Sequence, residues 1–158
     1  MVYSSRKLLF TILSSVCLNE SCIRVLALLN MLEQVKTVLR SSVKGKDWIT
    51  VILIVKKLIL PLTFTKLGRI QILKTKNLVE DLIVFLANAQ ATLISNTKDT
   101  TLLSKINNVI FVGNQQQAVA LRNHLILILR NLTWDSESKM YISSYLGMCI
   151  LTYIFEFY

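Results

Sequence analysis

The sequence is poor in the residues that interrupt regular secondary structure and in those that perform catalysis. Its 158 residues include four Gly and one Pro, too few for the closely spaced turns of an all-β sandwich or barrel. One histidine and three cysteines leave little material for a zinc site or a catalytic triad. Acidic residues are also scarce. Nine Asp and Glu stand against 18 Lys and Arg, which makes the net charge +9.

Apolar side chains are abundant, at 53% of the residues, so the chain can bury a core and disorder is not expected. The cysteines, Cys17, Cys22 and Cys149, form no CxxC pair. We interpret them as buried thiols in a reducing compartment, which predicts a cytoplasmic protein. The sequons at Asn19 and Asn131 would matter only in a secreted chain.

Helical spacing of the apolar residues recurs along most of the chain. We expect Asn19 to cap the second helix, a break near Asn30, and Pro61 to end the helix that starts at Trp48. The polar segments 41–47 and 95–100 are predicted to be loops. The predicted helices cover residues 5–17, 19–40, 48–60, 66–74, 77–90, 101–111 and 115–132.

One pattern occurs three times: a long apolar helix, a short polar turn, and then a brief helix. The copies begin at Leu13, Leu60 and Leu129. The first two lie 47 residues apart, close to the roughly 40–47 residues of armadillo and HEAT units. The second gap is 69 residues, and we attribute the excess to an insertion over residues 95–113.

Residues 120–133, ALRNHLILILRNLT, resemble the third helix of an armadillo repeat running into the next repeat. In such a repeat Asn131 would cap or brace neighbouring backbone. Over residues 5–142 the chain is similar to the C-terminal part of the rotatin family, whose members are armadillo-like proteins of centrioles and ciliary basal bodies. The resemblance implies a scaffold role in organising these structures.

The expected fold class is all-α, a right-handed stack of helices forming an armadillo/HEAT-like solenoid fragment of about three repeats. Residues 1–139 would form this repeat domain, and residues 140–158 an apolar C-terminal tail. Each repeat buries its core only against its neighbours. A stack as short as this one therefore leaves apolar end faces uncovered. We therefore expect the chain to be a fragment of a longer array.

No catalytic, cofactor-binding or metal-binding residue is predicted. His124 lies within an apolar helical stripe, which indicates a core or groove position and leaves a hydrolase without its base. Glu80 and Asp81 are adjacent and diverge by about 100° on a helix, so they are expected to serve the helix N-terminal dipole. The four glycines form no phosphate-binding loop.

A protein-binding surface is the expected functional feature, with acidic or helical segments as partners. Trp134 lies in a polar turn and is a candidate interface anchor. The cations could instead only solvate their helices, and this alternative stays open. Nucleic acid is not expected, since the basic stretch 40–76 holds only two aromatic residues. The candidate binding residues are Lys56, Lys57, Arg122, Asn123, Arg130 and Trp134.

The alternative is a small membrane-associated or secreted protein. Arg6 and Lys7 precede the apolar run Leu8 to Leu18, as in a signal peptide, but no small-x-small cleavage site follows clearly. Residues 140–155 form an uncharged run of 16 residues, shorter than the roughly 20 residues of a bilayer span.

Overall fold

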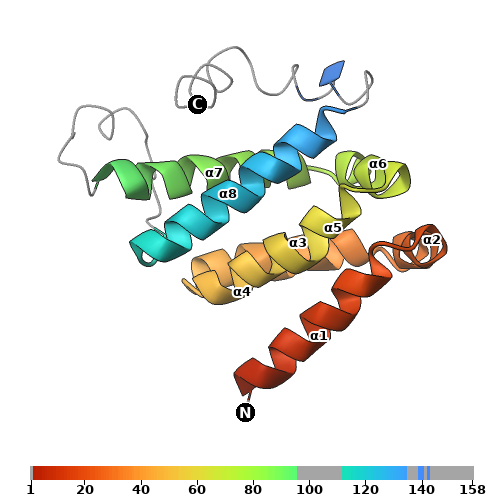
Figure 1. Ribbon diagram of the computed structural model, residues 1–158, viewed down its shortest axis with the longest axis horizontal. Coiled ribbons are helices and arrows are strands. Elements are labelled where there is room, and N and C mark those ends of the chain that lie inside the picture. The colour runs from red at the N-terminus through yellow and green to blue at the C-terminus, as the bar shows by residue number, and fades with distance from the viewer. Residues whose placement is uncertain (1, 96–111, 135–138, 141, 143–158) are drawn as a thin grey trace.

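A computed structural model describes residues 2–95, 112–134, 139, 140 and 142, with side chains from residue 8 onward. Within these residues the protein is all-helical and contains no strand, which confirms the predicted fold class at that level (Figure 1). The elements are α1 (Val2–Val16), α2 (Glu20–Leu28), α3 (Met31–Lys44), α4 (Trp48–Ile54), the π-helical turn η1 (Val55–Ile59), α5 (Leu60–Leu62), α6 (Lys66–Lys74), α7 (Leu78–Ser95) and α8 (Gln115–Leu132).

Side-chain caps place the starts of several helices. The Asn19 side chain accepts hydrogen bonds from the backbone of Ser21 at 2.9 Å and Cys22 at 3.2 Å, as predicted. Asn30 separates α2 from α3 in the left-handed region, with φ of 51°, so the predicted break is confirmed. Asn114 and Gln117 form a capping box at the start of α8.

Two predicted boundaries are wrong because the apolar stripe extends further than the polar residues beside it suggest. The loop predicted over 41–47 is only Gly45 to Asp47, since α3 continues to Lys44 and buries Val43 one turn after Leu39. Likewise α7 continues past residue 90 to Ser95. The bounds predicted for α6 and α8 are confirmed.

Pro61 does not end the helix that begins at Trp48, contrary to the prediction. Instead, α4, η1 and α5 follow one another without a break to Leu62. In η1 the Leu60 N–H donates to the Val55 carbonyl, five residues earlier. This wider turn changes the backbone hydrogen bonds just before Pro61. In an ordinary α-helix the proline ring would clash with the preceding turn, and residue 61 would have no N–H to donate.

Two sets of helices that are distant in the chain contact one another. The long helices form one series: α1 contacts η1 and α4, and the continuous helix α4–η1–α5 contacts α8 (Figure 1). The short helices α2 and α6 form a second contact. In addition, α3 lies on α4, the next helix along the chain, and α7 lies on α8. Ile54, Leu58, Leu82, Leu121 and Leu125 are among the side chains buried in the shared core.

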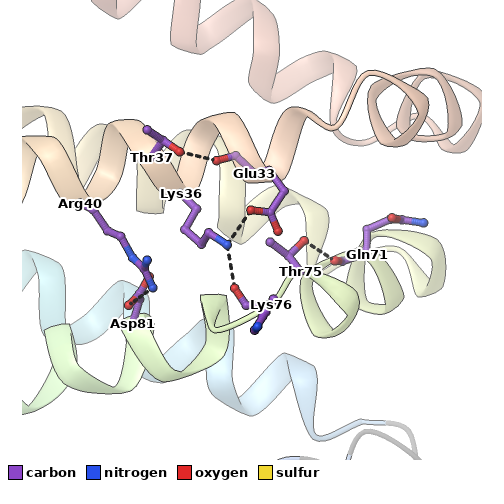
Figure 2. A network of polar contacts seen from close by, with 8 residues as sticks. All are labelled: Glu33, Lys36, Thr37, Arg40, Gln71, Thr75, Lys76 and Asp81. Atoms are coloured by element: carbon purple, nitrogen blue, oxygen red, sulfur yellow. Dashed lines mark hydrogen bonds and ion pairs between the residues drawn. The ribbon is translucent and has the colours of Figure 1, made fainter.

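Polar contacts join α3 to α7 and the turn before it (Figure 2). Arg40 donates to both carboxylate oxygens of Asp81, Nε at 2.7 Å and Nη2 at 3.0 Å. The hydrogen bond to Asp81 raises the pKa of Arg40 above its usual value. One turn earlier, Lys36 pairs with Glu33 and its Nζ donates to the Lys76 carbonyl at 2.8 Å. These contacts therefore link α3 to α7 and to the turn that precedes it.

The helix ends give a spacing to set beside the predicted repeat, which itself stays a prediction. The short helices α2 and α6 each have nine residues and start 46 residues apart, one fewer than the 47 residues between Leu13 and Leu60. When the ends of α1 and α5 are aligned, Leu13 corresponds to Ile59. Ile142 is buried in the common core. The predicted helix over 101–111 lies outside the described residues, as do most of 140–158, so the boundary at residue 139 stays a prediction.

Candidate protein-binding surface

Exposed apolar side chains occupy the same position in three successive turns. Each lies two residues after the last residue of a long helix: Leu18 after α1, Phe64 after α5 and Trp134 after α8. All three are more than half exposed to solvent. In the first two turns the following residue, Asn19 or Thr65, caps the next helix. We call Leu18, Phe64 and Trp134 the turn edge.

The three turns lie along one side of the molecule. In Figure 1 the ends of α1, α5 and α8 follow one another at the side where α2 and α6 lie. The contacts of α1 with η1, α2 with α6, and α5 with α8 agree with this order. The residues of the turn edge therefore follow one another along one side of the molecule, at the ends of α1, α5 and α8.

A buried polar network holds the turn between α5 and α6 against the end of α8. Asn131 is buried, and its Nδ2 donates to the Thr63 hydroxyl at 2.9 Å. That hydroxyl in turn donates to the Leu60 carbonyl at 2.6 Å. Arg69, also buried, donates to the Thr63 carbonyl at 3.0 Å, and its guanidinium lies 5.9 Å from the centre of the Trp134 ring. This cation–π contact orients an indole that is itself exposed.

The predicted binding cations occupy two separate elements. Lys56 is exposed and Lys57 half-buried on η1. On α8, Arg122 is half-buried and donates to the Oδ1 of its neighbour Asn123 at 3.3 and 3.2 Å. The fifth predicted cationic or amide position, Arg130, is exposed on the last turn of α8, four residues before Trp134.

Asn131 was predicted to cap or brace neighbouring backbone, but it instead holds the turn between α5 and α6. Its partner is the Thr63 side chain rather than a backbone group. Sequence reasoning missed Thr63, Arg69 and the two other members of the turn edge, Leu18 and Phe64. A signal was present for two of its residues, because Leu18 and Phe64 lie just before Asn19 and Thr65, the cap residues of the next short helices.

The groups weighed for chemistry serve structural roles where they are described. His124 is half-buried, with Nδ1 against the Ala120 carbonyl of its own helix. Asp81 pairs with Arg40, and both Asp81 and Glu80 lie in the first turn of α7. Burial, with a smaller effect from Cys22, raises the pKa of the Cys17 thiol to about 11. Cys17 is thus protonated at neutral pH and is not an activated nucleophile.

Among the described side chains, no group of three or more His, Cys, Asp or Glu is arranged to hold a metal ion. No single helix in the described part of the chain is long and apolar enough to cross a bilayer. Two sharply bent helix pairs meet the length and composition test together, Leu8–Val16 with Glu20–Leu28 and Lys66–Lys74 with Leu78–Ile94.

Comparison with known proteins adds no relative: no protein-family model, curated protein or solved structure matches the chain.

Proposed function

We propose that the chain is a non-enzymatic scaffold that binds other proteins, built as a right-handed armadillo-like solenoid fragment of about three repeats. The order of a long helix, a nine-residue helix and a second long helix supports this fold, since it occurs as α1, α2, α3 and again as α4–α5, α6, α7 before α8 begins a third unit. The contacts of α1 with η1 and of α2 with α6 support it too. In a solenoid, each unit contacts its neighbours in this way.

The observation that carries the proposed function is the turn edge. Three large apolar side chains are exposed at equivalent positions of successive turns, and aromatic residues such as Trp134 are enriched among binding hot spots. The indole of Trp134 is oriented from beneath by a buried arginine. An anchor that is ordered before binding loses less conformational entropy when a partner covers it.

The spacing of the turn edge favours a helical partner. Packed helices lie about 8–10 Å apart, so neighbouring residues of the turn edge are separated by a similar distance. Side chains seven residues apart on one face of an α-helix are separated by about 10.5 Å. Side chains on one face of a strand repeat every 6.4–6.8 Å or so and match this spacing poorly. The partner we propose is an amphipathic helix with an apolar side chain at every seventh position.

Charge supports an acidic partner. The chain carries a net charge of +9, and two exposed cations, Lys66 and Arg130, flank Phe64 and Trp134 in sequence. A field of this sign accelerates encounter with an acidic segment, and the effect weakens as salt is raised. Apolar contacts would then determine how long the complex lasts.

In the cell, we propose a cytoplasmic scaffold at centrioles or ciliary basal bodies. This part rests on the resemblance to the rotatin family over residues 5–142. Imaging of the tagged chain beside a centriolar marker tests it. Recovery in the membrane fraction, or glycosylation at Asn19 or Asn131, would contradict it and favour the membrane-associated or secreted alternative.

A designed peptide tests the turn edge directly. The probe is an acidic 21-residue helix with Leu at positions 4, 11 and 18 and a mixture of Ala, Gln and Glu at the other positions, a design of about three heptads. A control peptide has the same composition with the leucines spread around the helix. We expect the probe to bind at least about tenfold more tightly than the control by isothermal titration calorimetry, a difference of about 1.4 kcal/mol.

Matched variants connect that affinity to the surface. Phe64→Ala and Trp134→Ala should each weaken probe binding by about tenfold or more, the size expected for truncating a hot-spot aromatic. Val84→Ala removes an exposed apolar side chain from α7, away from the turn edge, and should leave the affinity unchanged. Equal binding of both peptides, or equal losses in all three variants, would contradict the proposed site.

A further inference from the structure

One buried arginine contacts both turns that carry an aromatic residue of the turn edge. Arg69 is 7% exposed, and its Nη1 donates to the carbonyl of Thr63, the residue before Phe64, at 3.0 Å. Its guanidinium also lies 5.9 Å from the centre of the Trp134 ring. Phe64 and Trp134 are themselves exposed. A single side chain from α6 therefore reaches the turn after α5 and the turn after α8.

The backbone that carries Arg69 is held close to the end of α5. A Cβ on Gly68 would lie 2.1 Å from the Leu62 carbonyl oxygen, so the first turn of α6 can pack this tightly only with glycine there. The Thr65 hydroxyl accepts from the Gly68 N–H at 3.0 Å, and the Arg69 N–H donates to the Thr65 carbonyl at 3.1 Å. The guanidinium of Arg69 thus extends from a fixed point between the two turns.

Backbone hydrogen bonds fix the two aromatic residues only as far as their main chains. The Phe64 N–H donates to the Pro61 carbonyl at 3.2 Å, and the Trp134 N–H donates to the Asn131 carbonyl at 3.3 Å. These bonds leave the direction of an exposed indole open. The contact with Arg69 supplies that direction, since a guanidinium favours the face of an aromatic ring.

The turn that carries Leu18 has a different side chain at the position of Arg69. The fourth residue of α6 is Arg69, and the fourth residue of α2 is Ile23. Ile23 is 1% exposed and belongs to the apolar core. An isoleucine packs against its neighbours but donates no side-chain hydrogen bond and presents no charge to a ring. The turn edge therefore has two unequal parts.

We propose that Arg69 is the positioning residue of the turn edge. It keeps Phe64 and Trp134 at one spacing, so these two side chains select a helix with apolar residues seven apart, and Leu18 adds apolar contact without selecting. This inference rests on the proposed function and adds which part of the site carries its specificity. Arginine suits the role because its planar guanidinium donates from its edge to a carbonyl and also stacks on an aromatic face.

Fluorine NMR tests the positioning role without any partner. The chain has two tryptophans, so labelling with 5-fluorotryptophan gives two signals, and Trp134→Phe assigns them. In Arg69→Met the Trp134 signal should move toward that of free 5-fluorotryptophan, because the ring loses its cation. The Trp48 signal should stay in place, since Trp48 lies at the opposite end of α4–η1–α5 from the turn. Arg69→Lys keeps the charge without the planar fork and should move the Trp134 signal less.

Calorimetry with the acidic probe helix and its control peptide tests the selection. Arg69→Met should weaken probe binding about tenfold and reduce the preference for the probe, whereas Leu18→Ala should weaken it less than about threefold. Val43→Ala removes a buried side chain of α3 and lowers stability away from the turn edge, so it should leave the affinity unchanged. Arg69→Met combined with Trp134→Ala should lose less than the product of the single losses, because Arg69 acts through Trp134.

Three results would overturn the proposal. These are an unmoved Trp134 signal in both Arg69 variants, probe binding by Arg69→Met as tight as in the unchanged protein, and a loss from Leu18→Ala as large as that from Trp134→Ala. If circular dichroism shows that Arg69→Met is unfolded, Arg69→Lys takes its place and should weaken binding by a smaller factor. If the unchanged protein does not prefer the probe, the proposed function fails, and the fluorine signals still decide separately whether Arg69 holds Trp134.

Discussion

Replacing Asn131 with alanine, alone and together with Thr63→Val, measures how strongly the turn between α5 and α6 is held to the end of α8. Asn131→Ala removes the bond from Nδ2 to the Thr63 hydroxyl and leaves a small cavity at a buried position. We expect a loss of about 2 kcal/mol of unfolding free energy, about 1 from the hydrogen bond and a similar amount from lost packing.

Thr63→Val keeps the shape of the side chain and removes its hydroxyl. The Asn131 amide then loses its Thr63 acceptor in a buried environment, which costs about 1–3 kcal/mol. The bond from Thr63 to the Leu60 carbonyl is lost in every variant that carries valine, so it cancels in a double-mutant cycle. The coupling energy between Asn131 and Thr63 should therefore be about 1 kcal/mol.

Urea denaturation followed by circular dichroism at about 222 nm gives the four free energies for this cycle, provided the unfolding is two-state. Asn123→Ala, at an exposed position of the same helix, serves as a control and should change stability by less than about 0.5 kcal/mol. Additivity of the two changes within about 0.3 kcal/mol would refute the reasoning. It would mean that the two side chains do not stabilise each other across the units.

Three further results are expected. Gly68→Ala should cost about 3 kcal/mol or prevent folding, because a Cβ at this position would lie 2.1 Å from the Leu62 carbonyl oxygen; thermal melts would show it. Burial raises the pKa of the Cys17 thiol to about 11, so between about pH 9 and 11 only the unfolded thiol loses its proton. The free energy of unfolding should therefore fall as the pH rises through this range. Cys17→Ala should remove about 2–3 kcal/mol of that fall, as measured by unfolding at a series of pH values. Arg40→Ala should cost at most about 1 kcal/mol at low salt and less at high salt, as measured by urea denaturation, since the pair with Asp81 is partly exposed.

Local signals in the sequence were sufficient for the helices themselves. Apolar periodicity predicted the bounds of α6 and α8, and the short polar side chain of Asn19 predicted a cap that the structure contains. These features depend on residues within a few positions of one another, so no knowledge of distant contacts is needed. The predicted helix boundaries were wrong where a buried residue such as Val43 extends a helix into a polar stretch.

The continuation of the helix through Pro61 depends on tertiary packing. Proline alone predicts a stop, but the π-helical turn changes the local pairing, and core contacts bury the residues on both sides of it. The candidate site also combines a residue that local sequence predicted with residues that only the fold brings together. Trp134 could be selected from its polar turn, whereas Leu18 and Phe64 became members of the same surface only once the helix ends were aligned.

The sequence by itself determined the helical class, the cap at Asn19 and the order of long and short helices, because each follows from spacing along a single segment. Tertiary structure decided which apolar positions are buried. Leu9 and Val55 have similar side chains at equivalent distances from a helix end, yet only Val55 is covered by a neighbouring unit. Burial depends on what lies across the interface, and periodicity within one helix carries no information about that neighbour.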